Sequence, residues 1–569
     1  MHGETESWQC SRTSSGSAGS PGLEHRTLPM RQGVAVPSGN PVSETSESRQ
    51  GVRVAAALVA VAMAAFLGAL VWAFPVDMDE LMPYHPIACL ADAQQANTYT
   101  SACGGYPTAL GPFEFQRAFN YVGATPALIL LPVLAVSSWV GWHLATGVVA
   151  LCVAAVGIAS SLGFRRIYAL VAVAWLPLAL ATIHDTGPIR FSLIALAWTP
   201  ALMYRFVVDR RRLVRLLSLA LVIVLWLLAT ESKPFYLYLT PGIVVWTLAA
   251  LEIRERGFVR ANVLHLAVAL GLAGVASLTL LLVMTVDGQP YLQYLASFGS
   301  PNSLSLTAGV GITFLALWPM TAQRFSLQYP NVDAQFPEIL QGPANALPLS
   351  TDRGAPLSLL LLGIAIVAVV ALLVWAAVRV FGSPETRPDG WWLMAATLVL
   401  FLGAVASRGG SVHHFVFAQV PLVALVALAS RRAGWTPIRA TVTVLAVSGL
   451  ALIAILSVPF KPEVSRDVDV VMSEAINRAE PDDIVNCQSW GCYYRYALEN
   501  RRDVPIVWAE TADQQAELFS RTASAGGLLY HVCRGCDMQT VQATFPAGQV
   551  THLTTTAEGW AVFAVQPRS

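Results

Sequence analysis

The sequence contains little charge. Asp, Glu, Lys and Arg make up only 12% of its 569 residues, whereas hydrophobic residues make up 55% and the mean hydropathy is +0.55. A water-soluble protein of this size needs more polar surface than such a composition can supply. The composition therefore predicts a protein embedded in lipid.

The sequence also lacks an excess of positive charge. Its formal net charge is zero, and no basic tail or stripe of the kind that binds phosphate backbones is present, so a nucleic-acid partner is excluded. Lysine is almost absent, because only 2 of the 35 basic residues are lysines. The position of each lysine is therefore conspicuous.

Large apolar residues are scarce in the first 50 positions, which are rich in Ser, Gly, Pro and Glu. Such a segment cannot bury enough surface to offset the entropy of ordering, so residues 1–50 are predicted to form a disordered tail. The apolar run at 54–74 is about as long as a bilayer core and has no small-residue cleavage site after it, which predicts a retained first helix. Arg49 and Arg53 flank its start and place the tail in the cytoplasm.

The remaining apolar runs predict ten further crossings, each close to the length that spans hydrocarbon. They lie at residues 143–163, 167–183, 188–207, 214–231, 236–251, 262–285, 356–378, 391–406, 412–430 and 437–458. The predicted fold class is therefore an α-helical polytopic membrane protein with about eleven transmembrane helices. We expect it to be a multi-pass protein of the cell membrane, in contact with membrane lipids.

Arginine clusters determine the predicted sidedness, because cytoplasmic loops are enriched in Lys and Arg. The clusters at 165–166, 210–215, 254–260 and 431–432 can all lie inside without contradiction.

This arrangement requires that two shorter apolar stretches, 121–138 and 304–320, do not cross. Both carry Pro and polar residues, which suit interfacial or re-entrant segments. If both stretches crossed as single spans, the arginine clusters that follow the stretch at 121–138 would be placed outside rather than in the cytoplasm.

The predicted transmembrane domain, 51–460, has two large outer loops, at 75–142 and 286–355. Six cysteines fall as close pairs in segments predicted to lie outside: Cys89 with Cys103, Cys487 with Cys492, and Cys533 with Cys536. Oxidising compartments favour disulfides, so the pairs agree with the topology. A four-cysteine zinc site built from the last two pairs is the alternative.

The C-terminal segment, 461–569, changes character. Helix-like stretches at 467–480, 491–500 and 511–523 alternate with apolar strand-like stretches at 483–487, 504–508 and 527–532. This alternation predicts a small extracytoplasmic α/β domain. It contains no glycine fingerprint or nucleophile motif, which favours a supporting or acceptor-binding role.

Carboxylates cluster directly after the first predicted helix, at Asp77, Asp79 and Glu80. Such a group can act as a general base or can provide hard oxygen ligands for a divalent metal ion. The alternative is that these residues only mark a solvated helix end.

Other ionisable residues occupy predicted outer turns, where they are costly and hence functional candidates. These residues are His184, Asp185, Lys233, Arg408, His413 and His414. Turns after packed helices stay near one surface, so we expect these groups to converge on one outward-facing cavity, where cations facing a carboxylate suit phosphate recognition. Helix capping, a local pair of Lys233 with Glu231, and an interfacial position of the histidines are the alternatives.

Several of these motifs resemble the GT-C class of membrane glycosyltransferases, notably the protein O-mannosyltransferase and lipid A aminoarabinose transferase group. A first helix followed by Asp79 and Glu80, with Tyr84 behind them, resembles the start of that class. The apolar stretch from Tyr121 to Trp142 is similar to its juxtamembrane helix.

The resemblance continues to about residue 250 and then fades. The segment D-T-G-P-I-R-F-S at 185–192 resembles the family's Arg-Pro-Tyr-Ala-Leu segment, and S-K-P at 232–234 resembles its Thr-Lys-Gly-Pro turn. The family's Lys-Pro-Pro before the juxtamembrane helix is missing and leaves Arg117 as a loose substitute, and Arg190 lacks the Pro-Tyr that usually follows.

The resemblance implies a GT-C-like enzyme that transfers a sugar from a polyprenyl-phosphate donor to a glycan, lipid or protein hydroxyl on the outer face of the membrane. It implies catalytic roles for Asp79, Glu80 and Asp185, with Lys233 near the donor phosphate. The other candidates for substrate binding are His184, Arg117, Arg190, Arg408, His413 and His414. A divalent metal ion is a candidate cofactor for these carboxylates. A secondary transporter and a non-enzymatic envelope assembly protein are the competing functions.

Overall fold

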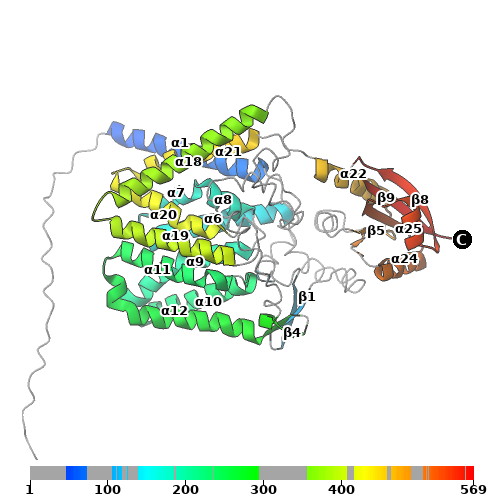
Figure 1. The fold of residues 1–569 in the computed structure, drawn as a ribbon, viewed down its shortest axis with the longest axis horizontal. Helices are drawn as coiled ribbons and strands as arrows, with labels where there is room; N and C mark the ends of the chain where they lie inside the picture. Colours follow the sequence, from blue (N-terminus) through cyan, green and yellow to red (C-terminus); the bar gives the residue numbers. More distant parts are fainter. Residues whose placement is uncertain are drawn as a thin grey trace, which may run out of the picture. The chain divides into compact units, whose positions relative to one another are not determined.

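The structure is a computed structural model. It describes residues 46–73, 106–110, 112–117, 123, 125, 139–184, 188–234, 236–286, 288–293, 355–406, 415–457, 463–488, 504–507, 509, 512–557 and 559–568. The predicted tail up to residue 45 and most of the stretches at 121–138 and 304–320 lie outside these ranges. Helices dominate residues 46–457, and a sheet with flanking helices forms residues 463–568 (Figure 1).

Long helices occupy the predicted apolar runs. They are α1 (Ser46–Ala73), α6 (Trp139–Ser161), α9 (Pro188–Val208), α10 (Arg212–Ser232), α11 (Tyr236–Arg254), α12 (Phe258–Val283), α18 (Ala355–Phe381), α19 (Arg387–Ala406), α20 (Val416–Arg432) and α21 (Pro437–Ser457). Among the described residues, 8 helices are long and apolar enough to cross a membrane, or up to 9 if one bent pair counts as a span. A helical, multi-pass membrane protein is thus supported, while eleven crossings stay a prediction.

Two helices explain most of this difference. Helix α20 has 17 residues, fewer than a straight crossing usually needs, and α19 carries Arg387 and Asp389 in its first turn. The interior position of α20 also sets it apart, because nearly all its residues from Val416 to Ser430 are buried.

The predicted span at 167–183 is two short helices rather than one straight helix. A 3-10 turn at Arg166–Tyr168 leads into α7 (Ala169–Val173), and α8 (Leu176–Ile183) follows at an angle of 79°. Pro177 in the first turn of α8 has no N–H, which suits a helix start. Buried polar groups of α20 and α21 compensate the break: the Trp175 indole donates to Gln419 Oε1 at 2.9 Å, and Leu176 N donates to Ser448 Oγ at 3.1 Å.

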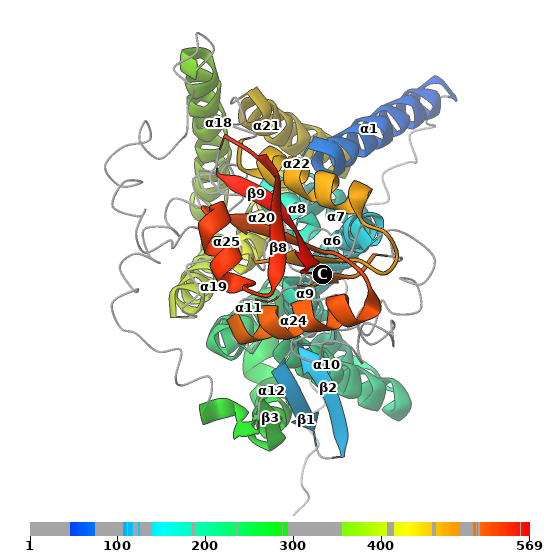
Figure 2. The same cartoon turned by 90° about the vertical axis from the view of Figure 1, so that its right-hand side faces the viewer.

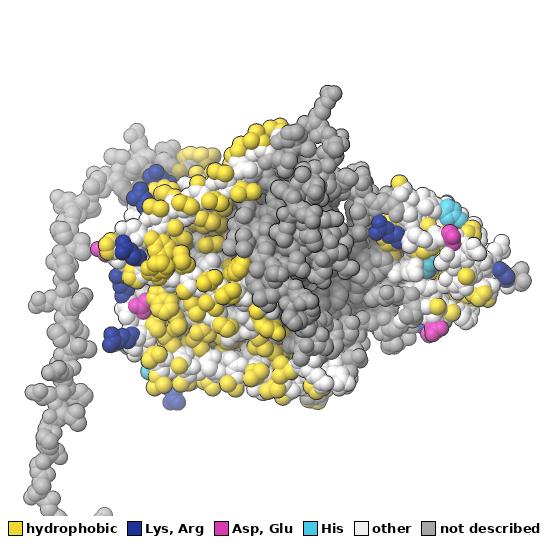
Figure 3. Space-filling model, in the orientation of Figure 1, with side chains coloured by type: hydrophobic (Ala, Val, Ile, Leu, Met, Phe, Trp, Pro, Cys, Tyr) yellow, Lys and Arg dark blue, Asp and Glu magenta, His cyan; other side chains and the backbone are white. Residues whose placement is uncertain are grey.

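Helix α9 lies inside the helical domain, packed against α6, α10 and α11. It contains Pro200, which cannot donate to the Leu196 carbonyl four residues earlier. The indole of Trp246 in α11 donates to that carbonyl at 3.0 Å and so replaces the lost helical bond. Apolar side chains cover much of the outer surface of these helices (Figure 3), as expected of a surface that faces lipid.

Arginines gather at one end of the helical domain, at the left in Figure 3. Arg256 pairs with Asp389 at 3.7 Å, Arg432 pairs with Glu385 at 3.2 Å, and Arg431 lies 5.2 Å from the Phe164 ring. These contacts connect several of the loops predicted to be cytoplasmic. The grouping agrees with the predicted pattern, and the assignment of this arginine-rich end to the cytoplasm stays a prediction.

At the opposite end, a four-stranded antiparallel sheet joins the two large loops predicted to lie outside. Strands β1 (Tyr106–Leu110) and β2 (Phe113–Arg117) form a hairpin in the first loop, and β1 also pairs with β3 (Met284–Val286), which continues directly from α12 and pairs with β4 (Gln289–Pro290). This sheet was not predicted from the sequence, although the alternation Phe-Glu-Phe-Gln at 113–116 is typical of a strand.

The C-terminal domain contains a five-stranded mixed sheet in the order β6-β5-β7-β9-β8. Strands β5 (Ile484–Cys487), β6 (Ile506–Val507) and β7 (Leu529–Arg534) are parallel, and β8 (Gly548–Thr555) and β9 (Trp560–Pro567) are antiparallel. Helix α22 (Glu463–Arg478) lies on one side of the sheet, and α24 (Ala512–Ala525) on the other (Figure 2). The predicted small sheet domain is confirmed; its helix at 491–500 lies outside the described residues, and α25 (Met538–Thr544), β8 and β9 were missed.

The cysteines of this domain form disulfides. Cys533 is bonded to Cys536, and Cys487 is disulfide-bonded as well. Its predicted partner Cys492, and the predicted pair of Cys89 with Cys103, lie outside the described residues. Zinc binds thiolates, so these disulfides argue against the alternative zinc site.

A buried polar pair lies between the parallel strands β5 and β7. Asn486 Nδ2 donates to His531 Nδ1 at 3.0 Å, and Asn486 Oδ1 accepts from Ala509 N at 2.9 Å. Because burial disfavours the imidazolium, the pKa of His531 is lowered from 6.5 to about 4. The ring is therefore neutral at pH 7.

This pair predicts a loss of stability in acid. Between pH 6.5 and about pH 4 the unfolded chain binds a proton at His531 that the folded domain does not bind. Stability from this group is thus full above pH 6.5 and falls by about 3 kcal/mol as the pH approaches 4. Hydrogen exchange of the β5 and β7 amides, corrected for its intrinsic pH dependence, should accelerate over this range in the full-length protein.

His531→Gln should reduce that acceleration, because glutamine does not titrate. The control is His552→Gln, which changes an exposed histidine of β8. Equal pH dependence in the protein with and without His531 would contradict the assignment.

Candidate functional site

Arg190 joins three helices at the end of the helical domain opposite the arginine-rich loops. It lies in the first turn of α9, is only 4% exposed, and donates through all three guanidinium nitrogens. Nε donates to Thr182 O at 2.9 Å and Nη2 to Ile183 O at 2.7 Å, both at the carboxyl end of α8. Nη1 donates to Thr146 Oγ1 at 3.0 Å, in the second turn of α6.

The sequence explains why an arginine is needed here. The last carbonyls of α8 have no partner within that helix and carry the negative end of its dipole. A guanidinium satisfies two of them at once and neutralises the local charge. Space for it depends on Gly147 of α6, where a Cβ would lie 2.8 Å from Arg190 Nη2 and from Ile183 O.

The fourth partner of Arg190 defines the state of a buried histidine. Nη2 lies 3.0 Å from Nε2 of His143, which is fully buried near the start of α6. A guanidinium can only donate, so this nitrogen must accept, and the proton of a neutral His143 ring is on Nδ1. His143 is thereby held beside a fixed positive charge.

His184 connects the same cluster to α1. It follows α8 directly and is buried, and its Nε2 lies 2.7 Å from the carbonyl oxygen of Leu70 in the last turn of α1. A carbonyl can only accept, so Nε2 carries a proton. The ends of α1, α6, α8 and α9 are thus joined by two side chains.

The turn between α10 and α11 contains the second cluster. Lys233 follows α10, is 5% exposed and has a partner within the chain. The neighbouring Glu231 accepts from Thr125 N at 3.0 Å, and Ser232 O accepts from Gly123 N at 2.8 Å. These bonds hold a short piece of the first loop against the end of α10.

Gly123 is required for this approach, because a Cβ there would overlap the carbonyl oxygen of Glu231. The two clusters lie at the same end of the helical domain, since α9 and α10 are neighbours joined by a short turn and run in opposite directions.

Buried hydroxyl groups without hydrogen-bond partners accompany these clusters. Thr230 and Ser232 lie in the last turn of α10, Tyr236 begins α11, and Ser192 lies close to Arg190 on α9. All four side chains are fully buried, and none of their hydroxyl oxygens has a partner in the part of the chain that the structure describes. Buried polar groups are usually hydrogen-bonded, so these four hydroxyls have hydrogen-bonding capacity that the described residues do not use.

Of the predicted site residues, His184, Arg190 and Lys233 lie together at this end of the helical domain. Arg117 ends β2 of the adjoining sheet. Asp79, Glu80, Asp185, Arg408, His413 and His414 lie outside the described residues. His143 was not predicted as a site residue, although an ionisable residue within an apolar run is a recognisable signal.

A metal site is not evident among the described residues, which contain no group of three or more His, Cys, Asp or Glu side chains arranged to hold an ion. The predicted carboxylate ligands after α1 are not among them.

Comparison with known proteins identifies no family by sequence. No protein-family model matches the chain, and no curated protein matches it significantly. Among solved structures, it is similar to the crystal structure of ArnT from Cupriavidus metallidurans in the apo state, with 14% sequence identity, a TM-score of 0.40, and coverage of 90% of this chain and 98% of that one. A TM-score of this size does not establish a shared fold, so the proposals below rest on the chain's own residues.

The Arg190 cluster predicts a large effect of a single substitution. Arg190→Gln replaces the guanidinium with a shorter amide whose single nitrogen cannot reproduce the bonds from both Nε and Nη2, and a buried carbonyl group left without a donor costs about 1–3 kcal/mol. We expect a clear decrease in the unfolding temperature of the purified protein in detergent. The decrease should be smaller for Arg190→Lys, which keeps the positive charge but loses the several separate donors of the guanidinium group.

Arg205→Gln is the matched control, because Arg205 is an exposed arginine in the last turn of the same helix. If both glutamine variants unfolded at the same temperature, the hydrogen bonds of Arg190 would not contribute to stability as described.

Proposed function

We propose that the protein is a GT-C-like membrane glycosyltransferase that moves a sugar from a polyprenyl-phosphate donor to an acceptor hydroxyl. The donor enters from the lipid, and the acceptor is a cell-envelope glycan, lipid or protein. The end of the helical domain that carries Arg190 and Lys233 faces outward in this proposal, and the arginine-rich end faces the cytoplasm.

One observation carries the proposal. Four fully buried hydroxyls that have no partner among the described residues accompany a buried lysine and a buried arginine at one end of a lipid-embedded helical domain, and this arginine donates through all three of its nitrogens. A ligand that offers both phosphate oxygens and sugar hydroxyls matches that chemistry, because hydroxyl groups can donate to the former and exchange bonds with the latter.

In the proposed function, the Arg190 cluster and the Lys233 cluster have different roles. Arg190 and His184 are positioning residues, because their bonds go to α6, α8 and α1. Lys233 is the proposed phosphate ligand, since a compact ammonium can neutralise the charge on the departing polyprenyl phosphate.

The proposed base is Asp79, with Glu80 beside it and Asp185 as a further carboxylate. Asp79 is six positions after Ala73, the last residue of α1, and six residues of extended chain span about 20 Å at most. The chain thus permits Asp79 to reach the end of the domain where His184 contacts α1.

The proposed chemical step is a substitution at the anomeric carbon of the donor sugar. The acceptor oxygen attacks the anomeric carbon, the bond from that carbon to the phosphate oxygen breaks, and polyprenyl phosphate leaves with both bonding electrons. The acceptor proton passes to Asp79. A phosphate leaving group needs little acid assistance, so the carboxylate acts mainly on the acceptor.

Asp79→Asn tests the assignment of the base. We expect turnover to fall about 10²- to 10⁴-fold, with folding retained, because the amide cannot accept the proton. Transfer from radiolabelled polyprenyl-phosphate sugars to a panel of acceptors is the measurement, and Asp92→Asn in the same loop is the control. Near-normal turnover by purified Asp79→Asn protein would refute the role, and a chelator series would show whether the carboxylates hold a divalent metal ion.

Lys233→Met tests the phosphate contact. Loss of one charged hydrogen bond should raise the KM for the lipid donor about 10- to 100-fold. The control is Lys461→Met, which removes the other lysine of the chain. An unchanged KM for the donor would remove Lys233 from the phosphate site.

A further inference from the structure

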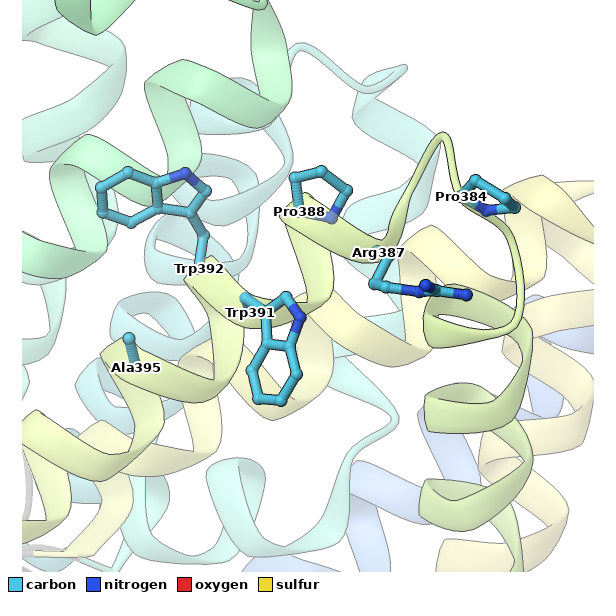
Figure 4. Close-up of a pocket in the computed structure, with 6 residues that line it drawn as sticks. All are labelled: Pro384, Arg387, Pro388, Trp391, Trp392 and Ala395. Atoms are coloured by element: carbon cyan, nitrogen blue, oxygen red, sulfur yellow. The ribbon is translucent and has the colours of Figure 1, made fainter.

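A shallow groove lies at the start of α19, at the arginine-rich end of the helical domain. Its volume is about 530 Å³, and its lining residues are Pro384, Arg387, Pro388, Trp391, Trp392 and Ala395 (Figure 4). It is distant from the proposed transfer site, because α19 runs antiparallel to α11: Gly403, near its end, packs on Tyr238 and Leu239, at the start of α11.

The spacing of the lining residues explains the groove. Arg387, Trp391 and Ala395 recur every four residues and form one ridge on α19, while Pro388 and Trp392 form the next. Residues of both ridges line the groove. The Trp391 ring is held by an edge contact with Phe381 of α18, with ring centroids 5.2 Å apart.

Arg387 provides the groove with a positive charge. Its Nε donates to Phe381 O at 3.0 Å, which leaves the two terminal nitrogens without a hydrogen bond to any described residue. The nearby acids serve other arginines, since Glu385 pairs with Arg432 and Asp389 with Arg256. The charge of Arg387 is therefore available to an anion.

An apolar stripe continues from the groove along the outer face of α19. Trp391, Met394, Leu398 and Leu402 follow helical spacing, and each is half or more exposed. From Trp391 to Leu402 the helix rises about 16 Å, close to the thickness of one leaflet of the hydrocarbon core. The positive charge of Arg387 thus lies at one end of an apolar stripe whose length matches one leaflet.

We infer that this groove binds an anionic phospholipid of the surrounding bilayer, with its phosphate group at Arg387 and one acyl chain along the α19 stripe. Trp391 occupies the level at which the headgroup meets the chains, where tryptophan is favoured in membrane proteins. Charge complementarity at Arg387 selects an anionic headgroup over a zwitterionic one.

Native mass spectrometry of the delipidated full-length protein tests the site. The probes are phosphatidylglycerol and phosphatidylcholine with identical acyl chains, and glycerol 3-phosphate as a headgroup without chains. We expect phosphatidylglycerol to be retained in preference to phosphatidylcholine, and glycerol 3-phosphate not to be retained. Arg387→Gln should lower phosphatidylglycerol occupancy about fivefold, the effect of one basic residue near an anionic lipid surface.

Two further variants make the result specific. Trp391→Ala should lower retention of both phospholipids, because it removes the wall that the chain and the headgroup share. Arg439→Gln is the matched control: Arg439 is exposed, belongs to the first turn of α21 and lies over the Trp435 ring at 4.9 Å, and it does not line the groove.

Absence of a phosphatidylglycerol preference, an equal loss in Arg439→Gln, or unchanged retention in both Arg387→Gln and Trp391→Ala would overturn the inference. Retention of glycerol 3-phosphate alone would also overturn it. Lipid occupancy is measured without any sugar donor, so these outcomes are separate from those of the proposed transferase reaction.

Discussion

The helical domain depends on a single guanidinium for the arrangement of one of its ends. Arg190 replaces the missing donors of the last α8 carbonyls and reaches two side chains of α6. In a hydrocarbon environment no water is available for such groups, so their pairing must come from the chain itself. At the break before α8, Gln419 and Ser448 from other helices likewise accept hydrogen bonds from residues 175 and 176. Irregular backbone inside this domain is thus tolerated where a specific buried side chain completes its hydrogen bonds.

The apolar runs located the long helices because twenty residues without charge have few other stable arrangements in a membrane. What they could not indicate was the bend between α7 and α8, since the residues that compensate it are more than 240 positions away in α20 and α21. The positions of His184 and Lys233 at one end followed from the predicted turns that contain them, whereas Arg190 was named only through the family resemblance and lies inside α9. The tautomers, the role of His143 and the buried hydroxyls depended on packing between helices, which no local pattern encodes.

The ligands proposed for the two ends of the domain differ in how much water they lose on binding. At the end with Lys233, cations and hydroxyls are buried, so any charge that binds there must leave water, and complementary contacts become strong and selective. At the arginine-rich end, several guanidinium groups stay near the surface and interact with acids, rings or carbonyls. Interactions there are screened by salt and suit weak, exchangeable lipid contacts.

The pairing of β1 with β3 has a consequence for biosynthesis. Thr108 is opposite Val286, so these partners are 178 positions apart in the chain. The β1–β2 hairpin therefore leaves the ribosome long before β3, and until α12 has been inserted one edge of β1 has no neighbour. A lone hairpin is only marginally stable in water and its open edge can pair wrongly. The four-stranded sheet is consequently completed late in synthesis, and chains truncated before residue 284 lack β3 and β4.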